Sequence, residues 1–447
     1  MQSFADIFKI PELRKRVFFT LGILVVYRVG VAIPIPGIDA SAIQQLFKSQ
    51  ANNFLGFLDM FSGGAMSRMS IFAMGVMPYI NSSIIMSLLQ GAHVIPYLDR
   101  LAKEGETGRR QLNKITRYFT LFLALIQSFG LTTLITKIRL GQDIAVVREP
   151  GALFVFTTVI TLTAGTLFIM WLGEQITESG IGNGISLMIF TGIVDRLPSA
   201  LNQMRRMVFE LQEMSLLTAL ALLALVVVVV GLVVWVETAQ RKIPVQYARR
   251  MVGRKMYGGA STFLPLKVDQ SGVIAVIFAV SLLSVPVTFA SFNPDGEWSK
   301  RILGFWNQRA LWYEMAYAGL IIFFCYFYNS VQTNPMDLAD NLKKWGGFIP
   351  GIRPGEPTAD YINTVLARIT LGGALFVAAL AVLPDILHRV MNTPFYFGGT
   401  SILIVVTVAL DTVGQLESHL IMRHYEGFSK TGRVKGRWFN VGAGSQS

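Results

Sequence analysis

Hydrophobic residues occur along the chain in long blocks that are separated by shorter polar stretches. The hydrocarbon core of a bilayer is about 30 Å thick, and a helix of about 20 apolar residues crosses it. Two blocks contain a single charge, 17–36 with Arg28 and 311–331 with Glu314. Five blocks of sufficient length contain no Asp, Glu, Lys or Arg: 71–91, 118–136, 153–172, 215–236 and 271–293.

Three weaker blocks complete the pattern, 181–194, 369–384 and 399–416, and they are short, rich in Gly or end in an acid. We therefore predict an all-α polytopic membrane protein with ten spans. Pro34, Pro36 and Gly37 follow the first span in place of a small-residue cleavage site, so we expect this span to be retained.

The composition agrees with a membrane protein. Hydrophobic residues are 52% of the 447 residues and charged residues only 15%, against roughly 25% charged in a soluble domain. This excludes a soluble enzyme, a disordered chain and an ordinary nucleic-acid-binding domain. A single cysteine, Cys325, excludes an intrachain disulfide and cysteine-based zinc sites.

The basic residues are distributed unequally between the two sets of loops. The net charge is +12, and the termini together with the even-numbered loops hold 26 Lys and Arg, against 12 in the other loops. Because basic residues are retained on the cytoplasmic side, we expect both termini to be cytoplasmic.

Ten spans divide into two halves of five, so the second half enters the membrane in the opposite direction. The glycine-rich stretches 182–186 and 398–402 resemble each other loosely at the start of the fifth and tenth spans. An inverted repeat places a pathway between the halves, which points to transport. A channel and a secondary solute transporter both remain open at this point.

Chemistry inside the spans is sparse. A driven transporter needs ionisable groups near the middle of the membrane, whereas Arg28, Glu314 and Asp411 lie near span ends, where interfacial anchoring explains them. The sequence contains no HExxH motif and no paired intramembrane carboxylates. We therefore expect no enzymatic activity, no cofactor and no metal site.

A short apolar segment between the first two spans, residues 53–68, has helical spacing but cannot cross the bilayer. Gly63 and Gly64 interrupt it. Such a segment is re-entrant or interfacial, and it is either a surface helix or a movable stopper in a pore. Hydroxyl and amide residues in the second, third and seventh spans indicate either tight helix packing or a seam that opens.

Two long segments on the predicted cytoplasmic side, 237–270 and 332–368, exceed simple connections. The first contains seven basic residues and two acidic ones. In the second, Arg353 stands between Ile352 and Pro354 in a stiff turn. Basic loops attract anionic lipids, and their length favours a large anionic partner such as ribosomal RNA.

Several motifs together resemble the SecY family, the channel subunit of the bacterial Sec protein translocon. The resemblance runs from the first span to about residue 425. It is carried by Met77-Pro78-Tyr79-Ile80, Lys103 to Arg110, Gly180 to Ser186, Leu264-Pro265-Leu266-Lys267 and Gly351-Ile352-Arg353-Pro354-Gly355-Glu356.

The resemblance implies ten helices in two inverted five-helix halves around an hourglass pore, which passes unfolded polypeptides across the plasma membrane and releases spans sideways. The halves are expected at 1–200 and 201–427, followed by a basic, Gly-rich tail at 428–447 without a fixed structure. The waist of the pore is expected to be a ring of aliphatic side chains: Ile80, Ile84, Ile185, Ile189, Ile277 and Ile404.

The resemblance also assigns three other sets of residues. The plug segment, about 54–70, includes Leu55, Phe57, Leu58, Met60, Phe61, Gly63, Gly64, Ser67 and Arg68. The lateral gate, between spans two, three, seven and eight, includes Ser83, Ser87, Gln127, Ser281 and Ser284. The docking site for a ribosome or motor ATPase includes Arg241, Lys242, Arg249, Arg250, Arg254, Lys255 and Arg353.

The partners that the resemblance implies are the small membrane subunits SecE and SecG, the motor ATPase SecA and the ribosome. Signal sequences, nascent polypeptides and anionic lipids complete the set. The sequence departs from the family pattern at Ala239 and Gln240, where a Gly and a second Arg are expected.

Overall fold

The computed structural model describes residues 10–39, 42–43, 59, 62–91, 95–137, 139–140, 144–145, 147, 150–212, 215–247, 250–252, 255–257, 261–291, 296–305, 311–391 and 399–431. The predicted plug residues Leu55, Phe57, Leu58, Met60 and Phe61 lie outside these ranges, as do the predicted docking residues Arg249 and Arg254.

Helices dominate the structure in both predicted halves. Those of the first half are α2 (Pro11–Ala32), α5 (Met77–Gly91), α6 (Pro96–Lys103), α7 (Glu106–Lys137), α8 (Ala152–Ser179), α9 (Gly184–Val194) and α10 (Leu197–Phe209). Those of the second half are α11 (Leu216–Thr238), α12 (Gly272–Ser291), α13 (Glu297–Phe305), α14 (Leu311–Gln332), α15 (Pro335–Lys344), α16 (Glu356–Met391) and α17 (Gly399–Thr431).

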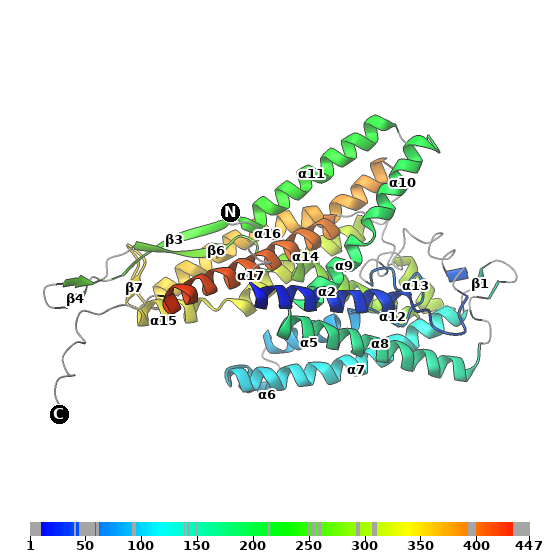
Figure 1. Cartoon of the computed structure of the whole chain (residues 1–447), viewed down its shortest axis with the longest axis horizontal. Helices are drawn as coiled ribbons and strands as arrows, with labels where there is room; N and C mark the ends of the chain where they lie inside the picture. The colour runs from blue at the N-terminus through cyan, green and yellow to red at the C-terminus, as the bar shows by residue number, and fades with distance from the viewer. Residues whose placement is uncertain are drawn as a thin grey trace, which may run out of the picture.

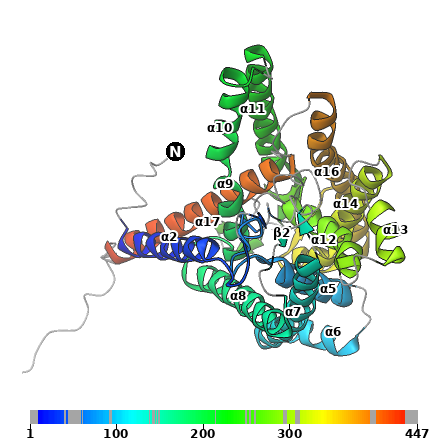
Figure 2. The same ribbon diagram turned by 90° about the vertical axis from the view of Figure 1, so that its right-hand side faces the viewer.

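The long helices run side by side along the long axis of the molecule, while α10 and α11 diverge from the bundle as a pair (Figures 1 and 2). Helix α12 is central to the packing, because it contacts α5 and α7 on one side and α14, α16 and α17 on the other. The two halves of the chain therefore meet along α12.

Seven helical stretches in the described part of the chain are long and apolar enough to cross a membrane. The seven include the three blocks with the weakest hydropathy signal in the sequence. Block 181–194 lies in α9, which is continued by α10, and blocks 369–384 and 399–416 lie in the long helices α16 and α17. The predicted spans at 17–36, 71–91 and 311–331 fall on α2, α5 and α14, which are not among the seven. Helix α5 has only 15 residues, fewer than the roughly 20 that a span needs.

The prediction of a helix from residue 71 is wrong in its first part. Residues 71–76 form turns, and α5 begins at Met77. Gly75 has φ +56°, in the left-handed region that a helix does not contain, so the helix starts after it. At the other end of the chain, α17 continues to Thr431, past the predicted boundary at 427, and residues 432–447 lie outside the described ranges.

Small sheets accompany the helices, and the described residues form three of them: β1 (Arg139–Leu140) with β2 (Ile144–Ala145), β4 (Arg250–Val252) with β5 (Lys255–Tyr257), and β3 (Gln240–Tyr247) with β6 (Ser261–Lys267) and β7 (Gly347–Phe348). The predicted loop at 237–270 is thus largely strand. The register Gln246↔Phe348 and Tyr247↔Gly347 joins it to the second long segment. A separate apolar core lies beneath this sheet, containing Ile243, Val245 and Leu266 from the strands and Ile362 and Leu366 from α16.

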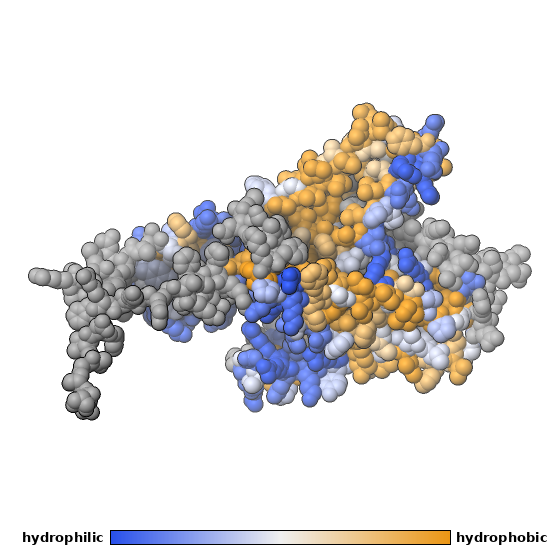
Figure 3. Space-filling model, in the orientation of Figure 1, coloured by the Kyte–Doolittle hydropathy of each residue, from blue (hydrophilic) through white to orange (hydrophobic). Residues whose placement is uncertain are grey.

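We call the region around β3, β6, β7 and α15 the sheet end of the molecule; β1 lies at the opposite end (Figure 1). Hydrophobic side chains cover much of the bundle and α11, whereas polar side chains lie along α10 and gather near α6 and the start of α7 (Figure 3). Leu217, Leu220 and Val227 of α11 and Phe18 and Val25 of α2 are among the exposed apolar residues. Such surface is stable only against lipid or other apolar helices.

Candidate functional site

The six isoleucines predicted to form a ring lie in one hydrophobic cluster. They come from four helices: Ile80 and Ile84 from α5, Ile185 and Ile189 from α9, Ile277 from α12 and Ile404 from α17. Four of them are buried, with Ile404 at 0% exposure, and Ile185 and Ile277 are half-buried against the same cluster. None of the six is among the exposed large apolar side chains of the structure.

Helical spacing explains why α5 and α9 each contribute two residues. Positions four apart lie on one face of a helix, so Ile80 and Ile84 face the cluster together, as do Ile185 and Ile189. Helix α5 packs against α12, α12 against α17, and α17 against α9. The four helices therefore form a continuous series of packed neighbours, and their isoleucines bring no charge to the cluster.

The start of α9 is fixed by the glycine-rich motif Gly180 to Ser186. Asn183 caps the helix, since its Oδ1 accepts hydrogen bonds from the backbone N–H of Ile185 at 3.1 Å and of Ser186 at 3.3 Å. A Cβ at Gly184 would lie 2.0 Å from the carbonyl oxygen of Gly173, so only glycine allows α8 and α9 to approach this closely. The motif that looked like a helix entry thus sets the position of Ile185 and Ile189.

A cluster of aliphatic side chains can close a passage without binding what passes. Isoleucine offers neither hydrogen bonds nor charge, so it makes no specific bond to a polypeptide, and a narrow aliphatic constriction excludes ions by dewetting. This is the chemistry that the six residues make available at the centre of the bundle.

Beside this cluster lies a stretch that we call the turn segment, defined as Asp59 and residues 62–76. The described part of the predicted plug consists mainly of turns, apart from Asp59, which is helical. Gly63 and Gly64 have φ +66° and +82°, and Met69 has φ +42°. These left-handed positions prevent a continuous helix, in agreement with the interruption that Gly63 and Gly64 indicate in the sequence.

The turn segment is packed tightly between α2 and α8. A Cβ at Gly30 of α2 would lie 1.9 Å from the ring of Phe72, and a Cβ at Gly165 of α8 would lie 2.0 Å from the carbonyl oxygen of Ile71. Tyr27 stacks on Phe72 with ring centroids 6.0 Å apart. Small residues on both helices therefore create the space that the segment fills.

Charged residues fasten the same segment. Asp59 forms an ion pair with Arg196, whose Nη2 also donates to the carbonyl oxygen of Asp59 at 2.9 Å. Arg28 forms an ion pair with Asp195 and donates from Nη1 to the carbonyl oxygen of Gly63 at 3.2 Å. The sequence interpretation of Arg28 as an interfacial anchor missed this bonding, because no pattern in the sequence brings residues 28, 59 and 195–196 together.

The predicted lateral gate corresponds to the faces where α5 and α7 meet α12 and α14, which we call the seam. Ser82 of α5, a neighbour of the predicted Ser83, donates to the carbonyl oxygen of Thr116 of α7 at 2.9 Å. Ser281 is buried and its hydroxyl has no hydrogen-bond partner among the described residues, while Ser284 donates to the carbonyl oxygen of Ser281 at 2.6 Å.

The other predicted gate residues, Ser83, Ser87 and Gln127, are half-buried. A Cβ at Gly91 of α5 would lie 2.6 Å from Val331 of α14, so the two helices approach closely at the sheet end of the seam. Phe278 of α12 meets Phe324 of α14 edge-on, with ring centroids 5.6 Å apart. The contact between α12 and α14 is therefore aromatic and apolar.

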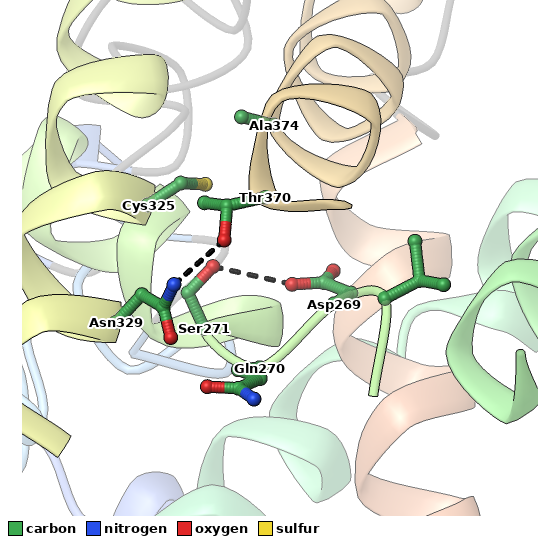
Figure 4. A pocket seen from close by; sticks show the side chains of 8 residues that line it. Asp269, Gln270, Ser271, Cys325, Asn329, Thr370 and Ala374 are labelled. Carbon is green, nitrogen blue, oxygen red and sulfur yellow. Dashed lines mark hydrogen bonds between the residues drawn. The ribbon is translucent and has the colours of Figure 1, made fainter. Parts of the chain in front are cut away.

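A polar pocket lies where α12 begins, next to α14 and α16 (Figure 4). Asp269 caps α12, since its Oδ1 accepts from the backbone N–H of Gly272 at 2.7 Å and from Ser271 Oγ at 3.2 Å. Asn329 of α14 donates to Thr370 Oγ1 of α16 at 2.7 Å. Burial raises the pKa of Asp269 from its ordinary value, an effect that its hydrogen bonds only partly offset. The Asn329–Thr370 hydrogen bond thus joins α14 to α16 beside the capped start of α12.

Those predicted docking residues that the structure describes lie at the sheet end. Arg241 and Lys242 are exposed on β3, and Arg250 and Lys255 belong to the β4–β5 pair. Arg353 is exposed in a turn between Gly351 and Gly355, whose φ values are +83° and +109°. Its carbonyl oxygen accepts from Thr358 Oγ1 at 2.8 Å, which fixes the turn to the start of α16. The side chain is thus presented to solvent on a rigid backbone.

Comparison with known proteins places this geometry in context. The family model for SecY matches residues 70–413. The chain is 46% identical over 428 residues to the protein translocase subunit SecY of Escherichia coli K12, covering 95% of this chain and 96% of the relative.

Two solved structures resemble the fold. One has a TM-score of 0.65 at 18% identity, covering 96% of this chain and 100% of the other. Its description states that the plug domain of the SecY protein stabilises the closed state of the translocation channel and maintains a membrane seal. The second, Sec61 in a canine ribosome-channel complex from the endoplasmic reticulum, has a TM-score of 0.59 at 16% identity, with the same coverage.

Proposed function

The chain belongs to the SecY family, and we propose that it forms a protein-conducting channel through which unfolded polypeptides cross a membrane. The single observation that carries this proposal is that six isoleucines from four helices, α5, α9, α12 and α17, lie together in one uncharged hydrophobic cluster. The relatives are named as protein translocase subunits, so catalysis is not part of the proposal. The relatives do not favour the alternative of a secondary solute transporter.

The six isoleucines form the waist of this channel. A passing chain displaces side chains that make only dispersion contacts with it, and these side chains close again behind it. The turn segment fills the space beside the waist when no chain is present. The tight seating of Phe72 against Gly30 and of Ile71 against Gly165 supports this role.

The seam is the lateral gate, through which signal sequences and apolar helices leave the channel for lipid. Its opening separates α5 and α7 from α12 and α14. The aromatic and aliphatic character of α12 and α14, together with the half-buried Ser83, Ser87 and Gln127, supports this role. Apolar contacts exchange readily with an arriving apolar helix, because lipid and helix surfaces are chemically alike.

The sheet end is the docking site for SecA and for the ribosome, with Arg353 and the basic residues of β3 to β5 as its contacts. Exposed Arg241 and Lys242 suit the phosphates of ribosomal RNA and the headgroups of anionic lipids. The exposed apolar faces of α2 and α11 suit lipid and the membrane helices of SecE and SecG. Nascent polypeptides and signal sequences are the cargo.

The ten-span arrangement in two inverted halves, 1–200 and 201–427, belongs to this proposal. It adds α2, α14 and α5 to the seven apolar stretches, and α5 crosses together with the apolar turns 71–76 that precede it. The sheet end and both termini then face the cytoplasm of a bacterial cell, and the chain lies in the plasma membrane. The excess of Lys and Arg in the corresponding segments supports this orientation.

Reconstitution tests the proposal. The chain is purified with SecE and SecG, placed in vesicles that contain anionic lipid, and supplied with SecA, ATP and an unfolded precursor. We expect precursor to become protected from added protease only when ATP is present. Vesicles that hold the folded chain with both small subunits and yet protect no precursor would overturn the proposal.

A further inference from the structure

Two ion pairs lie beside the turn segment, which is held by one of them directly and by the other through a hydrogen bond from Arg28 to the carbonyl oxygen of Gly63. One links Asp59 of the segment to Arg196, and the other links Arg28 of α2 to Asp195. Asp195 and Arg196 are adjacent at the junction of α9 and α10. We propose that these four charges form a latch that keeps the turn segment in its place and sets how readily the channel opens. This inference rests on the function proposed above.

Asp59 connects the internal shape of the segment to its anchor. Asp59 is 5% exposed, and its Oδ1 accepts hydrogen bonds from the backbone N–H of Ser67 at 2.8 Å and from Ser62 Oγ at 3.4 Å. The same carboxylate pairs with Arg196 through Oδ2. Loss of the Arg196 charge therefore leaves a buried carboxylate without its cation, which is unfavourable in this position.

Arg28 joins three parts of the structure. It lies on α2, pairs with Asp195 at the end of α9, and donates to the carbonyl oxygen of Gly63 in the segment. Its neighbour Tyr27 is 1% exposed and donates to the carbonyl oxygen of Ser62 at 3.2 Å. Adjacent residues on α2 thus bind adjacent carbonyl groups of the segment.

The placement of Asp195 and Arg196 couples the two pairs. Because they are consecutive and of opposite charge, a shift of the α9–α10 junction alters both pairs at once. The pairs are also accessible to water, with side-chain exposures of 33% for Arg196 and 41% for Asp195. Water and salt weaken such pairs, so the latch holds the segment and still releases it.

Cysteine labelling measures release of the segment. Met66 is 7% exposed, so Met66→Cys in a Cys325→Ala background is shielded from a membrane-impermeant maleimide until the segment leaves its site. Asp59→Asn and Arg196→Gln are each expected to raise the labelling rate about tenfold, the scale of one charge-assisted hydrogen bond. The double variant is expected to label no faster than either single variant, because both remove the same pair.

Arg205→Gln is the matched control, since Arg205 is exposed on α10 and carries the same charge. Raising KCl from 0.05 to 0.5 M is expected to speed labelling of the parent and to change the Arg196→Gln variant less. Unchanged labelling in Arg196→Gln, additive effects in the double variant, or an equal rise in Arg205→Gln would each overturn the latch.

A second variant covers the case in which Asp59→Asn does not fold. Asp195→Asn lies at an exposed turn, and it is expected to raise labelling severalfold; an unchanged rate there contradicts the coupling of the two pairs. Precursor transport by the parent protein is read separately. If the parent transports precursor and the variants label at the parent's rate, the latch alone is overturned. If the variants label faster and the parent transports no precursor, the channel function is overturned.

Discussion

Gly182 donates its backbone N–H to Oε1 of Gln415 at 2.9 Å, a hydrogen bond that joins the start of α9 to α17 across the two halves of the chain. Gly182 has φ +86°, so glycine suits this turn better than any other residue. The bond aligns the helix that carries Ile185 and Ile189 with the helix that carries Ile404.

Replacing Ile404 with Asn is expected to loosen the aliphatic cluster. Ile404 is fully buried, and an amide placed there without partners costs about 1–3 kcal/mol and attracts water into the constriction. We expect ion leak in planar bilayers and weaker discrimination between signal sequences. Ile160→Asn is the control, because Ile160 is 48% exposed on the outer face of α8. Equal conductance in the Ile404 variant and the parent would count against a waist at this position.

Reversing the charge of Arg353 is expected to abolish transport driven by SecA while leaving the membrane helices intact. The side chain is exposed, and only its carbonyl oxygen has a hydrogen bond to the rest of the turn, so Arg353→Glu changes the surface and not the packing. The measurements are precursor protection in vesicles and the unfolding midpoint Tm in detergent. Arg205→Glu at the opposite end is the control. Normal transport by Arg353→Glu would remove the docking role of this turn.

The pH dependence of stability is expected to contain a contribution from Asp269. Burial raises its pKa, so the folded protein binds a proton at this site more tightly than the unfolded chain does. Stability then falls as pH rises from the unfolded pKa, about 3.9, through the raised folded pKa, and the loss is complete above it.

Asp269→Asn keeps a good helix cap and removes this titration. The Tm of the variant is therefore expected to fall less than the Tm of the parent as pH rises from about 4 to about 8. Asp340→Asn, at an exposed position on α15, is the matched control and should follow the parent. Parallel Tm curves for parent and Asp269→Asn would contradict the assigned burial cost.

Close packing around the turn segment is expected to make Gly165 intolerant of any side chain. A Cβ there meets the carbonyl oxygen of Ile71 at 2.0 Å, and backbone cannot move aside as a flexible side chain does. Gly165→Ala should cost about 1–3 kcal/mol through overpacking. Gly22→Ala on α2, where a Cβ meets nothing within 4 Å, should instead be stabilising by about 0.5–1 kcal/mol. Thermal unfolding in detergent measures both, and equal Tm values would contradict the close approach.

Much of the helical pattern was readable from the sequence, and its failures have physical causes. Charge-free blocks located the cores of the long helices, but not their ends, since α16 begins at Glu356 and α7 at Glu106, outside any apolar block. The turn at Gly75 was invisible to hydropathy, because residues 71–76 are as apolar as the helix that follows. Their burial against α2 and α8, not their membership of a helix, explains that composition.

Some features of the candidate site could likewise be predicted from the sequence, and others could not. The resemblance identified the family, which the relatives confirm, and it named six isoleucines that the structure places in one cluster; their role as a waist stays a prediction. The pairs Asp59–Arg196 and Arg28–Asp195 could not be predicted, because each joins residues far apart in the chain and no periodic pattern records such contacts. The pairing of β3 with β7 was missed for the same reason.

The antiparallel pair β3–β6 has a mechanical consequence. Strand β3 starts directly after α11, β6 ends just before the cap of α12, and the backbone N–H of Val268 donates to the carbonyl oxygen of Ala239 at 3.0 Å to close the base of the pair. Arg353 follows β7, which is hydrogen-bonded to β3. In the proposed channel, a load applied by a docked motor is expected to pass through this strand pair to the first turn of α12, which contributes Ile277 to the isoleucine cluster and, like α5, lies at the seam.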